Sequence, residues 1–580
     1  MEINYTNEKN TQILITLLKK NNIRHIIVSP GSTNICFVAS VQHDSFFKLY
    51  SAIDERSAAY MACGLAAELN EPVCLSCTGA TASRNYMPGL TEAYYRNLPI
   101  LAISSTQPRE RVGHNIPQVL DRSSEPKDIV KCSVYIETAY NVEKEWAAKS
   151  LINRALIELK KDGGGPVHID LETTYSPDFN TRNLADVPIV NYYSSLKDIP
   201  NISHKQVAIF VGAHLKWSSK LTNLLDNFCE LYNGAVLCDH TSNYWGKYRI
   251  LPNVMSIQKS NKSPLLKIDF LIHIGEMSGA YLQIEPKVVW RINPDGRYKD
   301  TFRHLRILIQ SREDSFFEEM NRRNIREKNT SYFNKWKEEC NKIQRQIPEL
   351  PFSNAWIASV SSNCIPSNSV IHFGILNSLR TWNYFSLTDG VLGYCNTGGF
   401  GIDGCVSSLV GASLANKHKI FFGVVGDLAF FYDINSIGNR DIGSNLRLIV
   451  VNNGKGNEFR NYGNWCSPMG EYADEYICAA GHFGNQSRLL IKNYAENLGF
   501  IYFSATTKEE YNAVKDKFFT PNSYDKPIIL EIFTSTLNES KAIELIMNAS
   551  ENALSSAKKA AKKVLGKSGI KIIKKVIGKV

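Results

Sequence analysis

The sequence predicts an α/β protein made of three units, each built on a parallel sheet. Short apolar runs rich in β-branched residues alternate with longer stretches of helical periodicity, and this alternation recurs in three blocks along 580 residues. Successive parallel strands need a long crossover, which the helical stretches supply. With 43% hydrophobic residues, the chain is long enough to bury several cores.

The first unit is predicted at residues 1–185. Its strands are expected in the runs HIIVSP, PVCLSC, PILAIS and PVHIDL. A polar, proline-containing segment at 186–204 has no such run and is interpreted as a linker. The second unit, residues 186–346 with this linker, contains VAIFVGA, AVLCDH, FLIHIG, VVWRIN and HLRILI, and it ends in a charged helical stretch at 312–346.

The third unit, predicted at 347–545, contains the most informative motif. The run IFFGVVGD ends in Asp427, the run Leu446 to Val451 is followed by Asn452 and Asn453, and the segment Tyr432 to Arg440 fits a crossover helix. The carboxyl ends of parallel strands share one edge of a sheet, so an acid and an amide there can bind one hard cation. This arrangement indicates a Mg²⁺-diphosphate site, although two buried strands ending in ordinary polar turns remain an alternative.

A glutamate near the other end of the chain has two interpretations. Glu55 opens a helix of small residues in the stretch DERSAAYMACGLAAELN. In isolation such a residue is a first-turn carboxylate favoured by the helix dipole. Its occurrence far ahead of a GD…NN motif, taken with the family resemblance given next, favours a catalytic acid instead.

These motifs and their order resemble thiamine diphosphate-dependent enzymes, and most closely the menaquinone-pathway family of 2-succinyl-5-enolpyruvyl-6-hydroxy-3-cyclohexene-1-carboxylate synthases. The resemblance covers roughly residues 10–540 and rests on matching segments in both halves of the chain. They are VSPGS at 28–32, DERSAA at 54–59, NYMP at 85–88 with Glu92-Ala93, GPVHI at 165–169, DFLIHIG at 269–275, NSL at 377–379, GIDG at 401–404 and GDL at 426–428.

The resemblance implies roles for the cofactor-binding residues. It implies three doubly wound domains: a pyrimidine-binding domain, a central domain and a diphosphate-binding domain. It also implies a homodimer or homotetramer in which the cofactor lies between Glu55 of one subunit and Asp427 of another. Glu55 would protonate N1′ of the aminopyrimidine. Asp427, Asn453 or Asn452, and a carbonyl near Lys455 would bind Mg²⁺. The remaining residues expected beside the cofactor are Gly401, Ile402, Asp403, Gly404, Ser407, Ser408, Gly426 and Leu428.

The substrate residues depart from the resembled family. Its motifs hold polycarboxylate substrates with three arginines, and this sequence has Thr33, Gln107 and Thr397 in their place. We therefore expect poor use of isochorismate with 2-oxoglutarate. The neutral residues Ser32, Asn34 and Asn115 suit a polyhydroxy or carbonyl acceptor instead.

Four further residues are candidates for the substrate pocket. Gln118 matches a glutamine that the family places near the reacting centre. His114 is either a proton shuttle or a plain hydrogen-bonding residue. Arg84 and Arg380 are the cations expected to hold one carboxylate of a 2-oxo acid donor.

Two classes of function follow. The first is a thiamine diphosphate- and Mg²⁺-dependent transferase or lyase, and the second is a non-catalytic scaffold. Retention of Glu55, Asp427 and Asn453 favours the enzyme. We expect a carboligase that decarboxylates a 2-oxo acid and transfers the acyl-anion equivalent to an acceptor, such as a sugar precursor of a cell-surface glycan. A non-oxidative decarboxylase and the menaquinone-pathway synthase itself remain alternatives.

The C-terminal tail, 546–580, carries the net basicity of the chain. Residues 558–580 contain nine lysines and no acid, and the rest of the chain has a net charge of about +1. This amphipathic pattern favours a helix on an anionic membrane surface, with a solvated tail or a helix docked on a neighbouring subunit as alternatives. The segment has no aromatic residue to stack on bases, so nucleic acid is not expected as a partner.

Composition and the first residues favour a cytoplasmic protein, with the tail holding it peripherally on the inner face of the membrane. The start MEINYTNEKN lacks the pattern of a signal peptide, and no apolar run reaches membrane-spanning length. The thirteen cysteines are scattered, and Cys74 and Cys77 form a lone CxxC within an apolar run. We expect buried, reduced thiols there rather than a metal or redox site.

Overall fold

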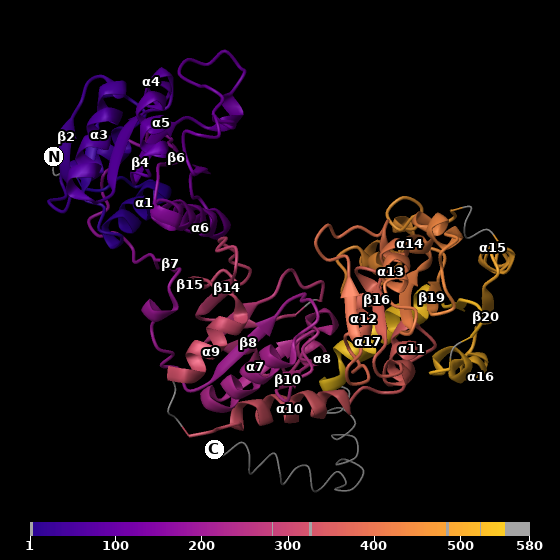
Figure 1. The fold of residues 1–580 in the computed structure, drawn as a ribbon. Helices are drawn as coiled ribbons and strands as arrows, with labels where there is room; N and C mark the ends of the chain where they lie inside the picture. Colours follow the sequence, from indigo (N-terminus) through magenta and orange to yellow (C-terminus); the bar gives the residue numbers. More distant parts are fainter. Residues whose placement is uncertain (1–3, 281, 324–326, 483–486, 523, 552–580) are drawn as a thin grey trace, which may run out of the picture. The chain divides into compact units, whose positions relative to one another are not determined.

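The computed structural model describes residues 4–280, 282–323, 327–482, 487–522 and 524–551. The predicted α/β class is confirmed, since the strand pairs described below are parallel and helices connect them (Figure 1). The chain divides into two compact units. The first comprises Met1–Ile199 and Asp295–Gln310, and the second comprises Pro200–Pro294 and Ser311–Val580, of which 552–580 lie outside the described residues.

The sheet of the first unit has the strand order β2-β1-β3-β4-β6-β5. Its strands are β1 (His25–Val28), β2 (Lys48–Ser51), β3 (Val73–Thr78), β4 (Ile100–Thr106), β5 (Cys132–Ile136) and β6 (Val167–Glu172). The four predicted strands are β1, β3, β4 and β6, which are mostly or fully buried. The edge strands β2 and β5 were not predicted, because their residues are partly exposed and form no continuous apolar run.

Helices cover both faces of this sheet. They are α1 (Lys9–Lys20), α2 (Ile35–Gln42), α3 (Glu55–Leu69), α4 (Thr81–Asn85), α5 (Met87–Tyr95) and α6 (Val142–Glu158). One buried cluster joins α1 and α6 to strand residues such as Cys74, whereas a second joins α3 and α5 to residues such as Leu75. Neighbouring strand residues face opposite layers, so this domain is doubly wound.

One strand lies in a segment that we expected to be a linker. β7 (Asn191–Tyr193) lies within the predicted linker 186–204, and it pairs with β15 (Leu305–Gln310), the run HLRILI assigned to the second unit. Both belong to the first compact unit. β7 is three residues long and none of them is fully buried, so its sequence carries no apolar signal.

The second unit contains a central sheet with the order β10-β9-β8-β12-β14. Its strands are β8 (Val207–Val211), β9 (Gly234–Cys238), β10 (Arg249–Ile250), β12 (Leu271–Ile274) and β14 (Val289–Asn293), and a small separate sheet pairs β11 (Lys267–Ile268) with β13 (Glu285–Pro286). The helices of this part are α7 (Ser219–Tyr232), α8 (Asn253–Ser256), α9 (Glu313–Arg323) and α10 (Ser331–Gln344). The predicted helical stretch 312–346 is therefore two helices.

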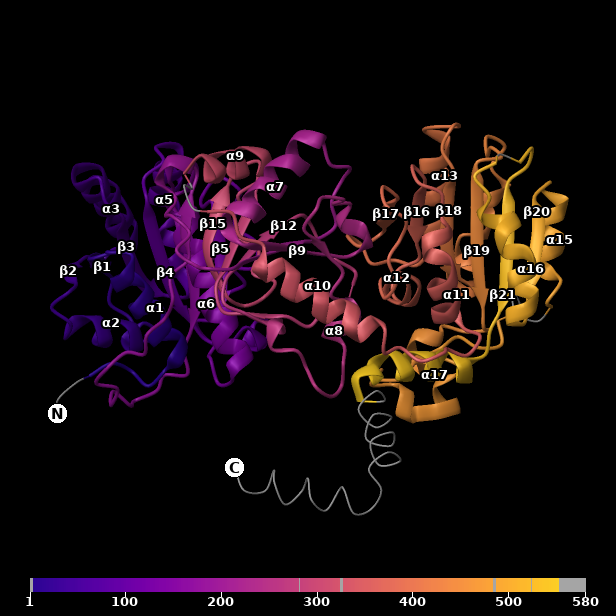
Figure 2. The same cartoon turned by 90° about the horizontal axis from the view of Figure 1, so that it is seen from below.

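The same unit contains a third sheet with the order β17-β16-β18-β19-β21-β20 (Figure 2). Its strands are β16 (Val370–Phe373), β17 (Leu392–Cys395), β18 (Phe421–Gly426), β19 (Leu446–Asn452), β20 (Ile501–Ala505) and β21 (Ile528–Phe533). Its helices are α11 (Asn354–Ser361), α12 (Asn377–Trp382), α13 (Cys405–Leu414), α14 (Asp427–Tyr432), α15 (Leu490–Asn497), α16 (Lys508–Phe519) and α17 (Thr536–Met547).

The crossover between β18 and β19 differs from the prediction. We expected its helix at Tyr432 to Arg440, but α14 begins directly at Asp427 and ends at Tyr432, and a 3₁₀ helix follows at Ile434–Gly438. Gly426 has extended backbone angles and caps α14, so no loop separates strand from helix. Asp427 is therefore both the end of the strand motif and the first helical residue.

Two predictions about organisation remain predictions. We predicted three domains with boundaries at residues 185, 346 and 545, and the division into two compact units does not test these boundaries. The basic segment 558–580 lies outside the described residues, and the last described helix, α17, ends at Met547. Among the described helices, none combines the length and apolar character that crossing a membrane requires.

Candidate functional site

Asp427 and the two asparagines lie at the carboxyl ends of neighbouring strands. β18 pairs with β19 in parallel, with Gly426 opposite Val451, so the residues that follow each strand share one edge of the sheet. Asp427 is 1% exposed, and Asn453 is half-buried just beyond β19. The local geometry thus brings together a carboxylate and a carboxamide, as the motif predicted.

The structure distinguishes the two asparagines. Asn452 Nδ2 donates to Glu531 Oε1 at 2.7 Å, and Asn452 Oδ1 accepts from the Gly454 amide at 3.3 Å. Asn453 Oδ1 is buried and has no hydrogen-bond partner among the described residues. A buried carbonyl oxygen without a partner is costly, and a bound cation would remove that cost. The donor set therefore fits Mg²⁺, and of the two asparagines Asn453 is the one whose side-chain oxygen lacks a partner among the described residues.

Glu531 is a member of this cluster that the sequence analysis did not identify. It is 1% exposed on β21, and it accepts hydrogen bonds from Asn452 and, at 2.8 Å, from the Tyr502 hydroxyl. Burial raises the pKa of Glu531, and the charge of Asp427 acts in the same direction. Its only sequence signal is an acid within the apolar run IILEIF. Glu531 therefore fixes the side chain of Asn452 by a hydrogen bond.

The side chain of Lys455 is engaged elsewhere. Its Nζ donates to Asp474 Oδ2 at 2.7 Å, and Arg460 pairs with the other oxygen of the same carboxylate. Burial acts to raise the pKa of Asp474, but the hydrogen bonds from these two cations hold it below its usual range. Any contribution of Lys455 to a metal would come from its backbone carbonyl, as predicted, and the preceding Gly454 has a φ of +79°.

The glycine segment Gly401 to Gly404 precedes α13, with Gly404 as the residue before the helix. In this segment only Asp403 is exposed, and the other predicted cofactor residues, Gly401, Ile402 and Gly404, are half-buried. The two neighbours of Asp427 in the chain, Gly426 and Leu428, are also half-buried.

The two serines of α13 already have partners in the protein. The Ser407 amide donates to Asp433 at 2.6 Å and its hydroxyl donates to the same carboxylate, while the Ser408 hydroxyl donates to Asn396 at 3.0 Å. These contacts give both serines a structural role in anchoring α13.

Glu55 begins α3 in the first unit. Asp54 caps the helix, because its carboxylate accepts hydrogen bonds from the Arg56 amide at 3.2 Å and from the Ser57 hydroxyl at 2.8 Å. The Glu55 side chain is therefore not the helix cap, and it is half-buried. Burial raises the pKa of the Cys77 thiol to about 12, and the charge of Glu55 acts in the same direction. Glu55 therefore lies near the carboxyl end of β3.

Residues 32–34 divide into one exposed and two buried residues. Ser32 is exposed, whereas Thr33 and Asn34 are each 1% exposed. Thr33 Oγ1 donates to the Ser105 carbonyl at 2.6 Å, and Asn34 Nδ2 donates to the Ser29 carbonyl at 2.9 Å. Asn34 also borders a cavity of about 600 Å³ beside β1, β2 and α2, and no charged residue is among the described residues that line it.

Gln107 has a cationic neighbour that the sequence analysis did not identify. Gln107 is 8% exposed; its Nε2 donates to the Pro117 carbonyl at 3.3 Å, and its Oε1 accepts from Arg111 Nη1 at 2.6 Å. Arg111 is exposed and lies four residues further along the chain. A cation is therefore present beside one of the positions where the resembled family has an arginine.

The remaining predicted substrate residues are less enclosed or already paired. His114, Asn115 and Gln118 are exposed, and Asn115 and Gln118 have φ values of +55° and +61°. Thr397 is 6% exposed and its amide donates to the Cys395 carbonyl at 2.8 Å.

Both predicted carboxylate-binding arginines have acidic partners. Arg84 Nη1 lies 3.5 Å from Glu125 Oε2, and its Nη2 donates to the Asp121 carbonyl at 2.7 Å. Arg380 Nη1 lies 2.5 Å from Glu458 Oε1. A donor carboxylate would have to compete with these partners.

The predicted residues thus form two groups. Asp427 and Asn453 belong to the second unit with Arg380 and Thr397, while Glu55, Arg84 and the residues from Ser32 to Gln118 belong to the first. Cys74 and Cys77 are buried, as expected, and neither forms a disulfide.

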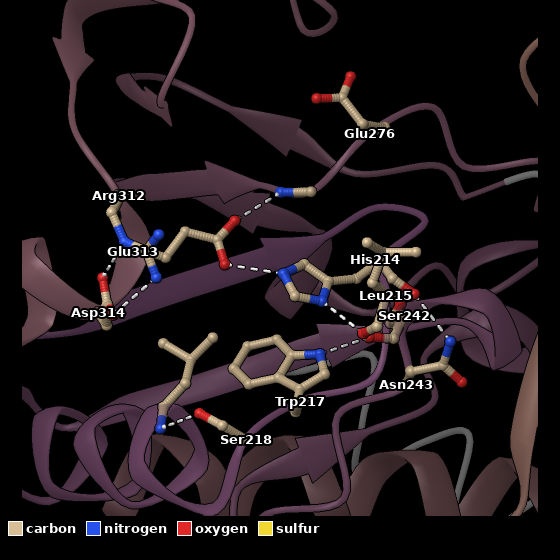
Figure 3. Close-up of polar contacts among 12 residues, drawn as sticks. His214, Leu215, Trp217, Ser218, Ser242, Asn243, Glu276, Arg312, Glu313 and Asp314 are labelled. Carbon is tan, nitrogen blue, oxygen red and sulfur yellow. Dashed lines mark hydrogen bonds and ion pairs between the residues drawn. The ribbon is translucent and has the colours of Figure 1, made fainter.

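A second polar site lies at the carboxyl ends of β8, β12 and β14, beside a cavity of about 720 Å³ (Figure 3). His214 Nε2 lies 2.8 Å from Glu313 Oε2, and Glu313 Oε1 accepts from the Gly275 amide at 3.3 Å. Burial acts to lower the pKa of His214, but the hydrogen bond and charge of Glu313 outweigh it and raise that pKa. The sequence analysis did not identify this pair, which joins residues 99 positions apart.

Comparison with known proteins supports the expectation that this chain is an enzyme that uses thiamine diphosphate. Residues 9–124 match the family described as thiamine pyrophosphate enzyme, N-terminal TPP binding domain. The chain is also similar to three proteins named 2-succinyl-5-enolpyruvyl-6-hydroxy-3-cyclohexene-1-carboxylate synthase. That of Bacteroides fragilis is 28% identical, with 93% of this chain and 98% of the relative covered. Those of Phocaeicola vulgatus and Bacteroides thetaiotaomicron are 28% and 27% identical, with 91% and 93% of this chain and 96% and 98% of the relatives covered.

Proposed function

We propose that this chain, an enzyme that uses thiamine diphosphate and is related to the synthases named above, is a Mg²⁺-dependent carboligase. It would decarboxylate a 2-oxo acid and transfer the remaining acyl unit to an acceptor carbonyl. The observation that carries this proposal is the buried Asp427 beside Asn453, whose Oδ1 has no hydrogen-bond partner among the described residues. A scaffold protein would have no physical need for such a donor set.

The protein groups have separate tasks in this proposal. Asp427, Asn453 and a carbonyl near Lys455 would hold Mg²⁺, which would supply positive charge to balance a diphosphate. Glu55 holds a proton at N1′ of the aminopyrimidine. When bound, thiamine diphosphate supplies the carbanion-stabilising centre that decarboxylation of a 2-oxo acid requires.

The assembly that we propose is a homodimer or homotetramer in which two subunits share each site. Glu55 and Asp427 lie in different compact units. The helix that Glu55 begins also exposes large apolar side chains, since Tyr60 is 48% and Met61 45% exposed. Exposed apolar groups on a helix beside a catalytic candidate are typical of a surface that a partner covers.

We infer that the acceptor is neutral and polyhydroxylated, such as a sugar precursor of a cell-surface glycan. Thr33 and Gln107 present a hydroxyl and an amide where the resembled family has arginines, and no charged residue lines the nearby cavity. Arg111, beside Gln107, is the cation best placed among the described residues of this loop to meet a donor carboxylate.

A substrate panel tests the proposed reaction. The full-length enzyme with thiamine diphosphate and Mg²⁺ is incubated with 2-oxo acids, with and without sugars and nucleotide sugars, and both CO₂ and new products are measured by mass spectrometry. We expect CO₂ release and a ligated product, both absent in Asp427→Ala. CO₂ release with no ligated product from any acceptor would favour the alternative, a non-oxidative decarboxylase.

The menaquinone-pathway reaction is the other alternative, because the relatives over more than nine-tenths of this chain carry that name. We expect poor turnover of isochorismate with 2-oxoglutarate. Each lost charged hydrogen bond to a carboxylate costs roughly 1.5–3 kcal/mol. Efficient turnover in a steady-state assay would mean that cations such as Arg111 replace the missing arginines.

We propose that the enzyme works in the cytoplasm, where its tail can meet an anionic membrane surface. All thirteen cysteines are free, which suits a reducing compartment.

A further inference from the structure

A cavity of about 400 Å³ lies apart from the candidate site. It is lined by residues of β10, α8, α10 and α11, by the 3₁₀ helix Ser362–Cys364, and by the turn that follows α12. Helices α8 and α10 and strand β10 can be located in Figure 1. None of the lining residues belongs to the catalytic, cofactor or substrate candidates, so the cavity needs its own explanation.

Arg249 of β10 faces this cavity without an acidic partner. Its guanidinium lies 4.1 Å from the centroid of the Trp245 ring, and no described residue forms an ion pair with it. Burial lowers the pKa of Arg249, although the charges of Asp239 and Asp389 act in the opposite direction from beyond ion-pair distance. A desolvated cation with no paired anion is unfavourable, so a bound anion would stabilise this arrangement.

A second cation borders the same cavity. Lys337 of α10 has its Nζ 5.6 Å from the centroid of the Phe333 ring, and no described residue forms an ion pair with it. The lining residues include no aspartate or glutamate. Both charges that border the cavity are therefore positive, which favours a phosphate or a carboxylate.

The rest of the lining is suited to hydroxyl groups. Besides apolar residues, the cavity is bordered by hydroxyl and carboxamide side chains that can both donate and accept hydrogen bonds. These are Asn341, Gln344, Ser359, Ser362, Asn363 and Ser386. The Ser359 hydroxyl donates to the Trp356 carbonyl at 2.6 Å, so its oxygen retains the capacity to accept. The volume lies within the range of roughly 300–1,000 Å³ that is typical of small-molecule sites.

We propose that this cavity binds a phosphorylated polyhydroxy molecule of the size of a sugar phosphate. The Arg249 guanidinium and the Lys337 ammonium hold the phosphate, and the serine and carboxamide side chains hold the hydroxyl groups. The proposal does not depend on the reaction proposed above, because the two sites share no residue.

Thermal unfolding of the full-length protein tests the ligand class. A ligand that binds only the folded state raises the unfolding midpoint in a concentration-dependent manner. We expect hexose 6-phosphate to raise the midpoint at concentrations at which inorganic phosphate and the neutral hexose have little effect. No shift with hexose phosphate, an equal shift with the neutral hexose, or an equal shift with inorganic phosphate would each overturn the proposal.

Substitutions of the two cations test whether hexose phosphate binds in this cavity. Lys337→Met should raise the concentration of hexose phosphate needed for half of the shift by roughly 10- to 100-fold, as expected for a lost charged hydrogen bond. The matched control is Lys335→Met, an exposed lysine on the same helix that does not line the cavity. Arg249→Met should abolish the shift and, because Arg249 is a half-buried cation with no ion-pair partner among the described residues, should not lower the midpoint without ligand. Wild-type responses in Lys337→Met and Arg249→Met would overturn the proposal.

Discussion

At the scale of single residues, hydrogen bonds outside the motif distinguish two neighbouring asparagines. The sequence places Asn452 and Asn453 side by side and cannot separate them. Glu531, nearly eighty residues further along the chain, accepts a hydrogen bond from Asn452 Nδ2 and leaves Asn453 Oδ1 without a partner among the described residues. We therefore expect Asn453, rather than Asn452, to bind the metal.

The two asparagines should respond differently to substitution. Loss of an outer-shell partner typically costs 10- to 100-fold in metal affinity, so we expect Asn453→Ala, which removes a direct ligand, to weaken Mg²⁺-dependent binding of thiamine diphosphate by at least about 100-fold. Asn452→Ala should have the smaller effect. Calorimetry with and without Mg²⁺ measures both variants, and a larger loss in Asn452→Ala would reverse the assignment.

The pair His214 and Glu313 predicts a pH dependence of stability. The pKa of His214 is raised in the folded protein, so its charged pairing with Glu313 stabilises the fold fully below the unfolded pKa of about 6.5, and this contribution is lost as the pH rises through the folded pKa. Glu313→Gln should therefore lower the midpoint of thermal unfolding more at acidic than at alkaline pH. If the unfolding midpoint fell equally at acidic and at alkaline pH, the pair would contribute only a neutral hydrogen bond.

At the scale of elements, burial determined what the sequence could predict. Strands that are buried on both faces, such as β8 and β18, have continuous apolar sequences, and for this reason they were predicted. The edge strands β2 and β5 and the short β7 are partly exposed and were missed. The site motifs at strand ends were predicted for the same reason, whereas Glu531, Arg111 and the pair His214–Glu313 depend on contacts that local sequence does not encode.

The segment 558–580 has an expected behaviour of its own. We predict that deleting it releases the enzyme from vesicles containing anionic lipid and leaves turnover unchanged. Each lysine near an anionic surface contributes on the order of 1 kcal/mol at low salt, and the isoleucines add apolar burial. Co-sedimentation of full-length and truncated protein measures this, with neutral vesicles as the control. Loss of turnover or of self-association on truncation would instead indicate a helix packed within the oligomer.

At the scale of the whole molecule, we propose that two subunits share each site. The candidate acid Glu55 and the candidate metal ligands lie in different compact units, and the resemblance implies that they come from different chains. A mixed dimer of Glu55→Gln and Asp427→Ala subunits would then contain one site with both native residues and one with neither.

Subunit mixing tests this arrangement directly. Each variant alone should be inactive. If subunits pair at random, half of the dimers are mixed and each has one intact site, so activity should recover to about a quarter of the wild-type value. Two wild-type preparations treated identically are the control for losses during mixing. No recovery, although mixed dimers form, would place Glu55 and Asp427 in the same subunit's site.

The most direct test of the central claim is exchange of the C2 proton of bound thiamine diphosphate, followed by NMR in deuterated buffer. An amide cannot serve as the acid at N1′, and positioned acid–base groups typically contribute 10²- to 10⁴-fold. Glu55→Gln should therefore slow exchange by roughly that factor while Mg²⁺-dependent cofactor binding is retained. Wild-type exchange in Glu55→Gln with bound cofactor would contradict the account.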